Sequence, residues 1–211
     1  MNKLLDLMLV GATGVVGSCV LAAALEDPRF AKVVAPTRRP LAAHDKLFNP
    51  VVDFSHLPED APWWKVDAVI CTLGTTIKTA GSRAAFAAVD RELPIHVARL
   101  ARRAGATRFA LNSSLGASHS GNFYLRTKAE AENGIRAIGY PCFNIVRPSL
   151  IDAKREPSRP IEFAGIVLLR ALGPVLPRRY RAVKPERIAR ALIEGVLADT
   201  RGEKITESER L

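Results

Sequence analysis

Short apolar runs alternate with helical patterns along most of the chain. The runs of strand length lie at residues 4–10, 32–36, 48–54, 66–72, 108–112 and 142–147. This alternation predicts a mostly parallel sheet with helices on both faces, which is the doubly wound α/β architecture. Because the chain has 211 residues, no internal repeat and no long linker, we expect residues 1–211 to form a single domain.

The strongest helical pattern covers residues 82–104, where apolar residues recur on one stripe and Gly105 ends the pattern. Pro94 lies inside it and predicts a bend or a break. The segment 55–64 is short and contains proline, so a full crossover helix is not expected there. The sheet edge is therefore expected to be less regular than in a complete doubly wound fold.

The alternation of strand and helix patterns ends after residue 151. A polar, proline-bearing loop is followed by an apolar helical pattern at 161–172, a stretch rich in proline and arginine, and a final helix that begins near Pro185. We interpret residues from about 152 to 211 as a small helical cap on the substrate side of the same domain.

Composition narrows the class of protein. A net charge of +10 is compatible with a protein that binds nucleic acid. However, the basic residues are scattered along the chain, and no motif alternates basic with aromatic residues. A solvated basic surface that attracts phosphorylated ligands is the preferred interpretation, and specific nucleic-acid binding is not expected. The longest late apolar run, at 163–176, is too short to span a bilayer and contains Arg170.

The cysteines indicate a reducing compartment. Cys19, Cys71 and Cys142 are odd in number, lie in apolar patterns and have no metal-ligand spacing. The apolar start contains Asp6 and has no small-residue cleavage site, so it is not interpreted as a signal peptide. These features predict a cytoplasmic protein.

A glycine-spaced turn directly after the first strand predicts where a dinucleotide binds. Gly11 permits a tight turn, Gly14 lets the backbone approach a pyrophosphate, and Gly17 lets the following helix lie close to the sheet. The N–H groups of the first helical turn then offer an anion site. The second predicted strand is followed by Arg38 and Arg39 where an acidic residue would hold a free ribose 2′-hydroxyl. A 2′-phosphate suits these guanidinium groups, so NADP(H) is favoured over NAD(H).

A second constellation predicts carbonyl chemistry. The strand at 108–112 is followed by Ser113 and Ser114, and ligands of open α/β sheets sit at the carboxyl ends of strands. Tyr124 and Lys128 then share one helical face. A phenol is a weak acid with a pKa of roughly 10, and a nearby ammonium favours its phenolate form. The tyrosine would exchange a proton with a carbonyl oxygen, the serine would orient that oxygen, and Lys128 could also hold the nicotinamide ribose.

The remaining polar residues give weaker indications. The four histidines share no metal-ligand spacing, so no metal site is predicted. His119 precedes Tyr124 and could face a substrate. Six charged residues of the C-terminal third fit either an anionic substrate or a merely solvated basic loop: Asp152, Arg155, Arg159, Arg178, Arg179 and Arg181.

Together these motifs resemble a known family. The runs VGATGVVG and CTLGTT, the segment ending in NSSLGA and the Tyr124/Lys128 pair are similar to the atypical, NmrA-like and extended-like (epimerase-like) short-chain dehydrogenases. Within this NAD(P)-binding Rossmann superfamily they are most similar to the group around the Tat-interacting oxidoreductase. The similarity covers about residues 4–160. It implies a Rossmann fold, NADP(H) binding and a catalytic set of Ser114, Tyr124 and Lys128, with Ser113 as the second choice of serine.

The resemblance also implies cofactor contacts by position. The pyrophosphate would touch Gly11, Thr13, Gly14, Val15 and Val16, and the 2′-phosphate would touch Arg38 and Arg39. The adenosine and nicotinamide ribose side would be lined by Leu73, Gly74 and Thr75, with Tyr124 and Lys128 also binding the cofactor, and the nicotinamide amide would lie between Pro148 and Ser149. The chain departs from the extended members at Asp90, where many of them carry an asparagine that supports the proton relay. Asp90 could pair with Arg91 or serve the relay differently.

Two functions follow. The first is an oxidoreductase acting on an unidentified small carbonyl, hydroxyl or sugar-nucleotide-like substrate. The second is an NADP(H)-sensing regulatory or scaffold protein without turnover, since the family has regulatory members. A homodimer or a protein partner is left open in either case.

Overall fold

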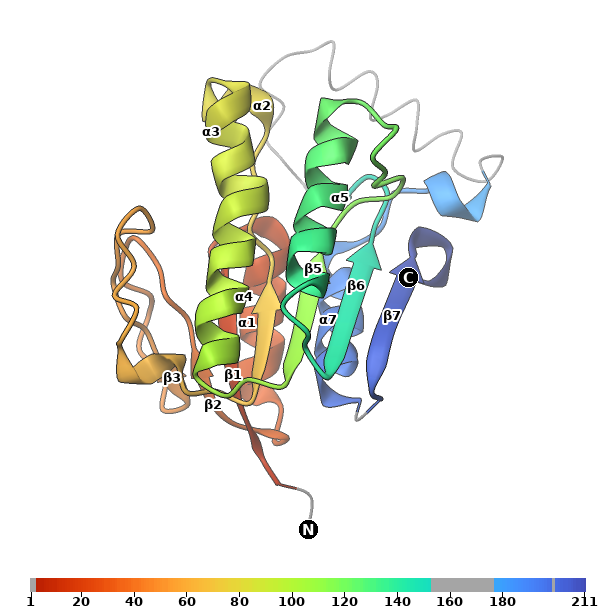
Figure 1. Cartoon of the computed structure of the whole chain (residues 1–211). Helices are drawn as coiled ribbons and strands as arrows, with labels where there is room; N and C mark the ends of the chain where they lie inside the picture. Colours follow the sequence, from red (N-terminus) through yellow and green to blue (C-terminus); the bar gives the residue numbers. More distant parts are fainter. Residues whose placement is uncertain (1–2, 153–176, 199) are drawn as a thin grey trace.

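A computed structural model describes residues 3–152, 177–198 and 200–211. Its centre is a seven-stranded sheet of order β3-β2-β1-β4-β5-β6-β7 in which every neighbouring pair is parallel. The strands are β1 (Leu5–Val10), β2 (Phe30–Val34), β3 (Leu47–Phe48), β4 (Ala68–Cys71), β5 (Arg108–Asn112), β6 (Cys142–Arg147) and β7 (Gly202–Glu207). The mostly parallel α/β fold predicted from the alternating pattern is confirmed (Figure 1).

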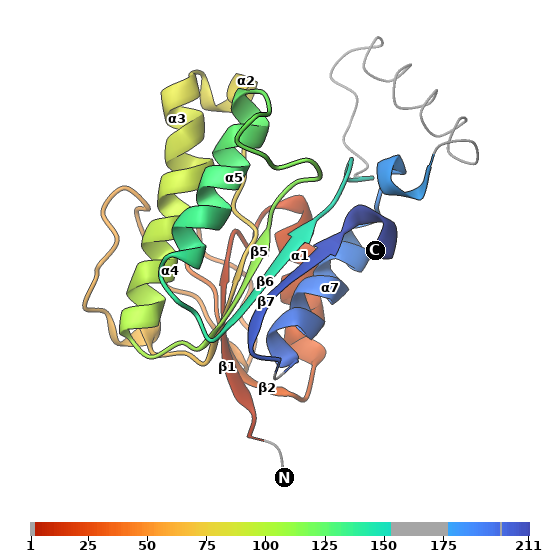
Figure 2. The same cartoon turned by 45° about the vertical axis from the view of Figure 1, so that its right-hand side comes forward.

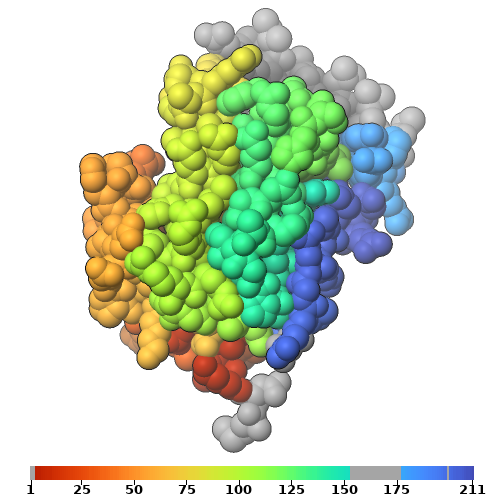
Figure 3. Space-filling model, viewed as in Figure 1, coloured from red at the N-terminus to blue at the C-terminus, as the bar shows by residue number. Residues whose placement is uncertain are grey.

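Helices cover both faces of the sheet. Helices α1 (Val15–Glu26) and α7 (Pro185–Leu197) pack together on one face, and α4 (Leu93–Arg103) and α5 (Phe123–Arg136) pack together on the other (Figure 2). Two clusters of buried apolar side chains fill the spaces on either side of the strands. In Figure 3, α4 and α5 lie side by side over the sheet and form most of that face of the molecule.

The long helix predicted at 82–104 is divided into three parts. After a short α2 (Ile77–Ala80), the chain forms α3 (Arg83–Ala87), a π-helical turn at Ala88–Glu92, and α4. Pro94 is the second residue of α4, directly after the π turn, and has no N–H to give to the helical hydrogen-bond pattern. The predicted break is therefore a π turn just before the proline. This turn buries Asp90, which is 2% exposed.

Two edge features differ from the sequence prediction. The strand expected at 48–54 pairs only over Leu47–Phe48 and at a bridge between Thr37 and Val51, because Asn49 and Pro50 interrupt the run. The strand β7 was not predicted, since its residues are polar and mostly exposed or half-buried. As expected, the segment 55–64 holds no full crossover helix and forms only a 3-10 turn at Pro62–Trp64.

The described C-terminal residues belong to the layers of the sheet. Helix α7 packs against α1, and β7 extends the sheet beside β6. Short 3-10 turns lie at Arg178–Tyr180 and Ser208–Arg210. The helix predicted at 161–172 lies outside the described residues, and the cap from about residue 152 stays a prediction. No helix among the described residues combines the length and apolarity needed to cross a bilayer.

Candidate functional site

The glycine turn between β1 and α1 forms a cradle of backbone. Gly11 has a φ of +92°, and the Gly14 N–H donates to the Gly11 carbonyl at 3.0 Å. A Cβ atom on Gly17 would lie only 1.9 Å from the same carbonyl oxygen. Gly14 caps α1 without a side-chain hydrogen bond, so no capping side chain among the described residues occupies the N–H groups of the first turn. This shape, with free N–H donors and no Cβ in the way, fits a pyrophosphate.

The residues predicted to touch that pyrophosphate differ in exposure. Thr13, Gly14 and Val15 are exposed at the mouth of the turn, and Gly11 is half-buried. Val16 is 4% exposed and packs into the core beneath α1. Val16 can therefore contact an anion through its backbone N–H but not through its side chain.

An asparagine outside the predicted set shapes the loop that carries the two arginines. The Asn49 amide donates to the Ala35 carbonyl at 2.6 Å and to the Thr37 hydroxyl at 2.8 Å. The Thr37 hydroxyl in turn donates to the Arg39 carbonyl at 2.6 Å. The only sequence signal for this role was an asparagine in a strand pattern, where it is unfavourable.

Arg38 and Arg39 themselves are exposed, and neither forms an ion pair with another described residue. They follow β2, which is parallel to β1, so they reach the edge of the sheet that carries the glycine turn. Two guanidinium groups at this edge could meet a phosphate together.

The loop after β4 joins the predicted ribose contacts to the predicted catalytic pair. The Thr75 N–H donates to Asp90 Oδ2 at 2.8 Å. A Cβ atom on Gly74 would lie 3.5 Å from Asp90 Oδ1 and 3.7 Å from Lys128 Nζ. Gly74 is exposed and Leu73 is half-buried. Parts of the chain far apart in sequence are thus brought together at the carboxyl edge of β4.

Lys128 is held in a buried ion pair. Its Nζ lies 2.6 Å from Asp90 Oδ1, and the two side chains are 9% and 1% exposed. Burial pushes the pKa of Lys128 down, but the charges of Asp90 and Tyr124 outweigh it and raise the pKa above its usual value. The ammonium therefore stays charged. The expectation that Asp90 could pair with Arg91 is wrong, because Arg91 turns outward and binds Glu130 and Glu92.

Tyr124 lies one helical turn before Lys128 on the same face of α5. Its ring is half-buried and packs on Phe86, with ring centroids 5.6 Å apart. Lys128 Nζ is 6.0 Å from the centroid of the Tyr124 ring. The pair predicted from the spacing therefore occurs as a side-by-side phenol and ammonium. Such a pair can hold and move a proton.

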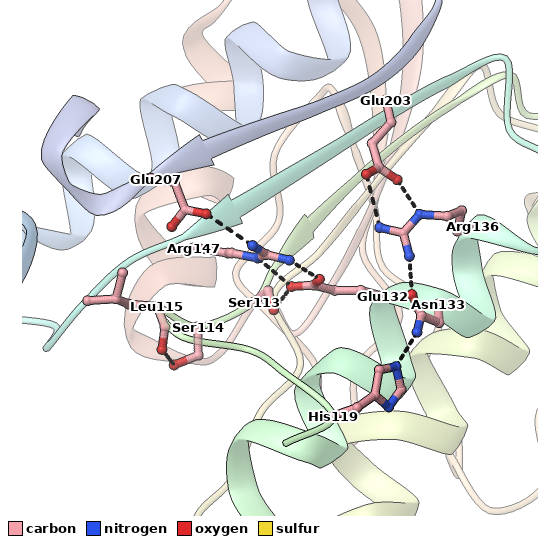
Figure 4. A network of polar contacts seen from close by, with 10 residues as sticks. All are labelled: Ser113, Ser114, Leu115, His119, Glu132, Asn133, Arg136, Arg147, Glu203 and Glu207. Atoms are coloured by element: carbon pink, nitrogen blue, oxygen red, sulfur yellow. Dashed lines mark hydrogen bonds and ion pairs between the residues drawn. The ribbon is translucent and has the colours of Figure 1, made fainter. Parts of the chain in front are cut away.

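The two candidate serines have different surroundings (Figure 4). The buried Ser113 hydroxyl donates to Glu132 Oε1 at 2.5 Å, and Arg147 binds both oxygens of Glu132, at 2.9 and 2.6 Å. Within the described parts of the chain, the half-buried Ser114 hydroxyl makes one long contact, of 3.5 Å, to the neighbouring Leu115 carbonyl. Because the Ser113 hydroxyl already donates its hydrogen bond to Glu132, these contacts favour Ser114 as the serine that would contact a substrate.

The Glu132–Arg147 pair was missed in the sequence. Glu132 is 2% exposed, and Arg147 also reaches Glu207 of β7 at 3.0 Å. A signal was present, since Glu132 follows Lys128 by four residues on one helical face. This network ties α5, β6 and β7 together behind the serine loop.

Residues after β6 link the serine loop to the C-terminal segment. Buried Pro148 accepts from the Leu115 N–H at 2.8 Å, the Ser149 N–H donates to Ser208 Oγ at 3.1 Å, and the Ser149 hydroxyl donates to the Arg181 carbonyl. Beside this link lies a hollow of about 470 Å³ whose lining includes Arg178, Arg181, Arg187, Arg210, Ser208 and Glu209.

Other sequence candidates stand apart from this site. His119 contacts Asn133 on the outer side of α5 (Figure 4). Arg155 and Arg159 lie outside the described residues. The three cysteines are free thiols, and burial raises the pKa of Cys71 to about 11. Among the residues that the structure describes, no group of His, Cys, Asp and Glu could hold a metal ion.

Comparison with known proteins identifies the family. The model of the NAD(P)H-binding family matches residues 11–165. The chain belongs to this NAD(P)H-binding family. It is 32% identical to the protein HTATIP2 of Rattus norvegicus over 94% of this chain and 84% of that protein. It is also 32% identical to the mitochondrial protein fmp52 of Aspergillus fumigatus over 98% of this chain and 93% of that one. The predicted membership of the NAD(P)-binding Rossmann superfamily near the Tat-interacting group is thereby confirmed.

Solved structures show the same fold at low identity. The UDP-glucuronic acid 4-epimerase from Bacillus cereus, in complex with UDP-glucuronic acid and NAD, superposes with a TM-score of 0.73 at 13% identity. The match covers 96% of this chain and 77% of the epimerase. It supports the Rossmann fold and the epimerase-like arrangement of the sheet.

The prediction of a cytoplasmic location is wrong, since the fmp52 relatives carry the name mitochondrial. The features behind it were three unpaired thiols and the lack of a cleavage motif. Such features indicate reducing surroundings and do not distinguish the cytoplasm from other reducing compartments.

Proposed function

We propose that the chain is an NADP(H)-dependent oxidoreductase of the short-chain dehydrogenase type that acts on a small carbonyl or hydroxyl compound. The observation that carries the proposal is the buried Lys128 ammonium beside Tyr124 and against Gly74. An ammonium kept charged next to a phenol, at the carboxyl edge of the sheet, is suited to proton transfer at a bound carbonyl.

The residues divide the work in carbonyl reduction. The phenol of Tyr124 gives its proton to the carbonyl oxygen, and the Ser114 hydroxyl donates a hydrogen bond that orients this oxygen. Lys128 stabilises the phenolate that is left and can hold a ribose hydroxyl on the Gly74 side. The nicotinamide, when bound, supplies the hydride. Pro148 and Ser149 follow β6 where they would flank its amide.

We assign the preference for NADP(H) to Arg38 and Arg39. Replacing both with serine removes charged hydrogen bonds to the 2′-phosphate, at a cost of about 2 kcal/mol or roughly 30-fold in the dissociation constant. We expect NADPH binding to weaken by that factor and NADH binding to change little, as measured by calorimetric titration. The Arg99→Ser/Arg103→Ser variant removes the same net charge from exposed positions of α4 and serves as the control. Equal weakening for both coenzymes in the Arg38/Arg39 variant would rule out the assignment.

An anionic or sugar-nucleotide-like substrate is supported by the arginine-lined hollow beside Ser149 and Ser208. The epimerase with the same fold was solved with UDP-glucuronic acid. The test is a screen for NADPH oxidation with carbonyl compounds in pairs that differ by one carboxylate or phosphate. Faster oxidation with the charged member of each pair is expected. Tight NADPH binding without any oxidation across the panel would instead support the sensing role.

A further inference from the structure

Asp90 is a buried carboxylate that the proposed mechanism does not use. It lies in the π-helical turn Ala88–Glu92, and such turns often occur at functional sites. The turn points Asp90 toward the carboxyl edge of β4, while Arg91 and Glu92 face outward. A buried charge is costly unless it is paired, so its place beside Lys128 needs a reason.

The two oxygens of Asp90 have separate partners. Oδ2 accepts from the Thr75 N–H at 2.8 Å, and Oδ1 lies 2.6 Å from Lys128 Nζ. The carboxylate is thus fixed at one side by the backbone of the Gly74 loop and at the other by the ammonium. An asparagine has only one acceptor oxygen, so it could satisfy only one of these two partners.

We propose that Asp90 is a positioning residue that anchors the Lys128 ammonium against the Gly74 loop and offsets its charge, so that Tyr124 faces a neutral ion pair rather than a free cation. The catalytic meaning of this arrangement rests on the proposed function. A free ammonium would stabilise a nearby phenolate strongly, whereas an ion pair does so weakly. Asp90 therefore limits how strongly the Lys128 ammonium stabilises the phenolate that is left after proton transfer.

Helices α3 and α5 pack against the π turn that carries Asp90, and their charged groups other than Lys128 are paired or stacked elsewhere. Burial keeps the Cys71 thiol of β4 protonated. Arg91 is neutralised by Glu130 and Glu92, whereas Arg83 stacks on Phe123. The other charged or titratable groups of the surrounding elements are Cys71 of β4, Arg83 of α3, Arg91 and Glu92 of the π turn, and Arg126 and Glu130 of α5. Among the described residues, Asp90 is the one carboxylate in direct contact with Lys128.

The chain allows a direct test because it has three tyrosines. Burial raises the pKa of Tyr140 far above its usual value, and Tyr180 is 51% exposed and can be replaced by phenylalanine. In a Tyr180→Phe background, the first rise in tyrosinate ultraviolet absorbance on raising the pH then belongs to Tyr124. Loss of that rise in Tyr180→Phe/Tyr124→Phe confirms the assignment. No substrate or coenzyme is needed.

In this background, Asp90→Asn is expected to move the tyrosinate step to lower pH by about one unit, since the ammonium is no longer offset. Glu92→Gln removes a carboxylate from the same π turn, at a side chain that is 61% exposed, and is expected to leave the step in place. An unchanged step in folded Asp90→Asn, or a step moved to higher pH, would overturn the proposal.

The Asp90→Asn/Lys128→Met variant covers the case in which the single variant does not fold, because it leaves no unpaired buried charge. The tyrosinate step of this double variant is expected at nearly the same pH as in the starting protein. The step of Lys128→Met alone is expected at higher pH, because the Asp90 carboxylate is then left without its cation. A double variant that shifts as far as Lys128→Met would show that Asp90 offsets nothing. Titration of the same proteins with NADPH separates the two proposals, since the tyrosinate step tests the ion pair and coenzyme binding tests the proposed function.

Discussion

Tyr124→Phe is expected to lower kcat for carbonyl reduction by about 100-fold to 10,000-fold, with little change in NADPH affinity. The phenol is the group placed to give a proton to the carbonyl oxygen, and phenylalanine removes only the hydroxyl. The ring contact with Phe86 at 5.6 Å is kept, so the helix that carries Lys128 should not move. The measurement is steady-state NADPH oxidation with a carbonyl substrate found in the paired screen.

Tyr180→Phe is the matched control, because it makes the same change at an exposed tyrosine. It should leave kcat within experimental error. If Tyr124→Phe turned over the same substrate at the full rate, Tyr124 would not be the proton donor, even if NADPH affinity were unchanged.

Gly17→Ala is expected to destabilise the fold by about 3 kcal/mol and to weaken NADPH binding at least tenfold. In an ordinary helix interior, replacing glycine with alanine stabilises by about 1 kcal/mol, so the sign is reversed here. The reason is that the new Cβ would lie 1.9 Å from the Gly11 carbonyl oxygen and 2.7 Å from Thr72 Oγ1. Backbone cannot yield as a flexible side chain does, so α1 must move away from β1 and open the cradle.

Urea unfolding and calorimetric titration of the same preparation measure both effects. Ser18→Ala is the control, since Ser18 is the next residue of α1 and its side chain is exposed. It should be neutral or slightly stabilising. A Gly17→Ala protein as stable as the starting protein would mean that helix and strand do not approach as closely as described.

Local chemistry explains which parts could be predicted from sequence. The glycine turn, the Tyr124/Lys128 face and the position of Pro94 depend on residues near one another in the chain, where spacing and backbone preferences decide the structure. The strand β7 has no such signal, since it is polar and its pairing with β6 comes from the completed sheet. Edge strands of this kind are stabilised by their neighbour rather than by their own composition.

The finer parts of the site depend on contacts between distant segments. The sequence motif contains two adjacent serines and does not show which of them faces a substrate. In the structure, Ser113 differs from Ser114 because its hydroxyl donates to Glu132. Asp90 is a visible departure from the family, but the sequence alone does not show whether it pairs with its neighbour Arg91 or with a distant residue. The packing of α5 against the π turn brings Lys128 to Asp90 and decides the partner. Asn49 was missed for the same reason, because its acceptors lie on the preceding strand and loop.

The most direct test of the whole account is calorimetric titration of the purified chain with NADPH and with NADH. The backbone cradle of Gly11, Gly14 and Gly17 predicts saturable binding of one coenzyme per chain, and Arg38 with Arg39 predicts tighter binding of NADPH than of NADH. A folded protein that binds neither coenzyme would contradict the central claim.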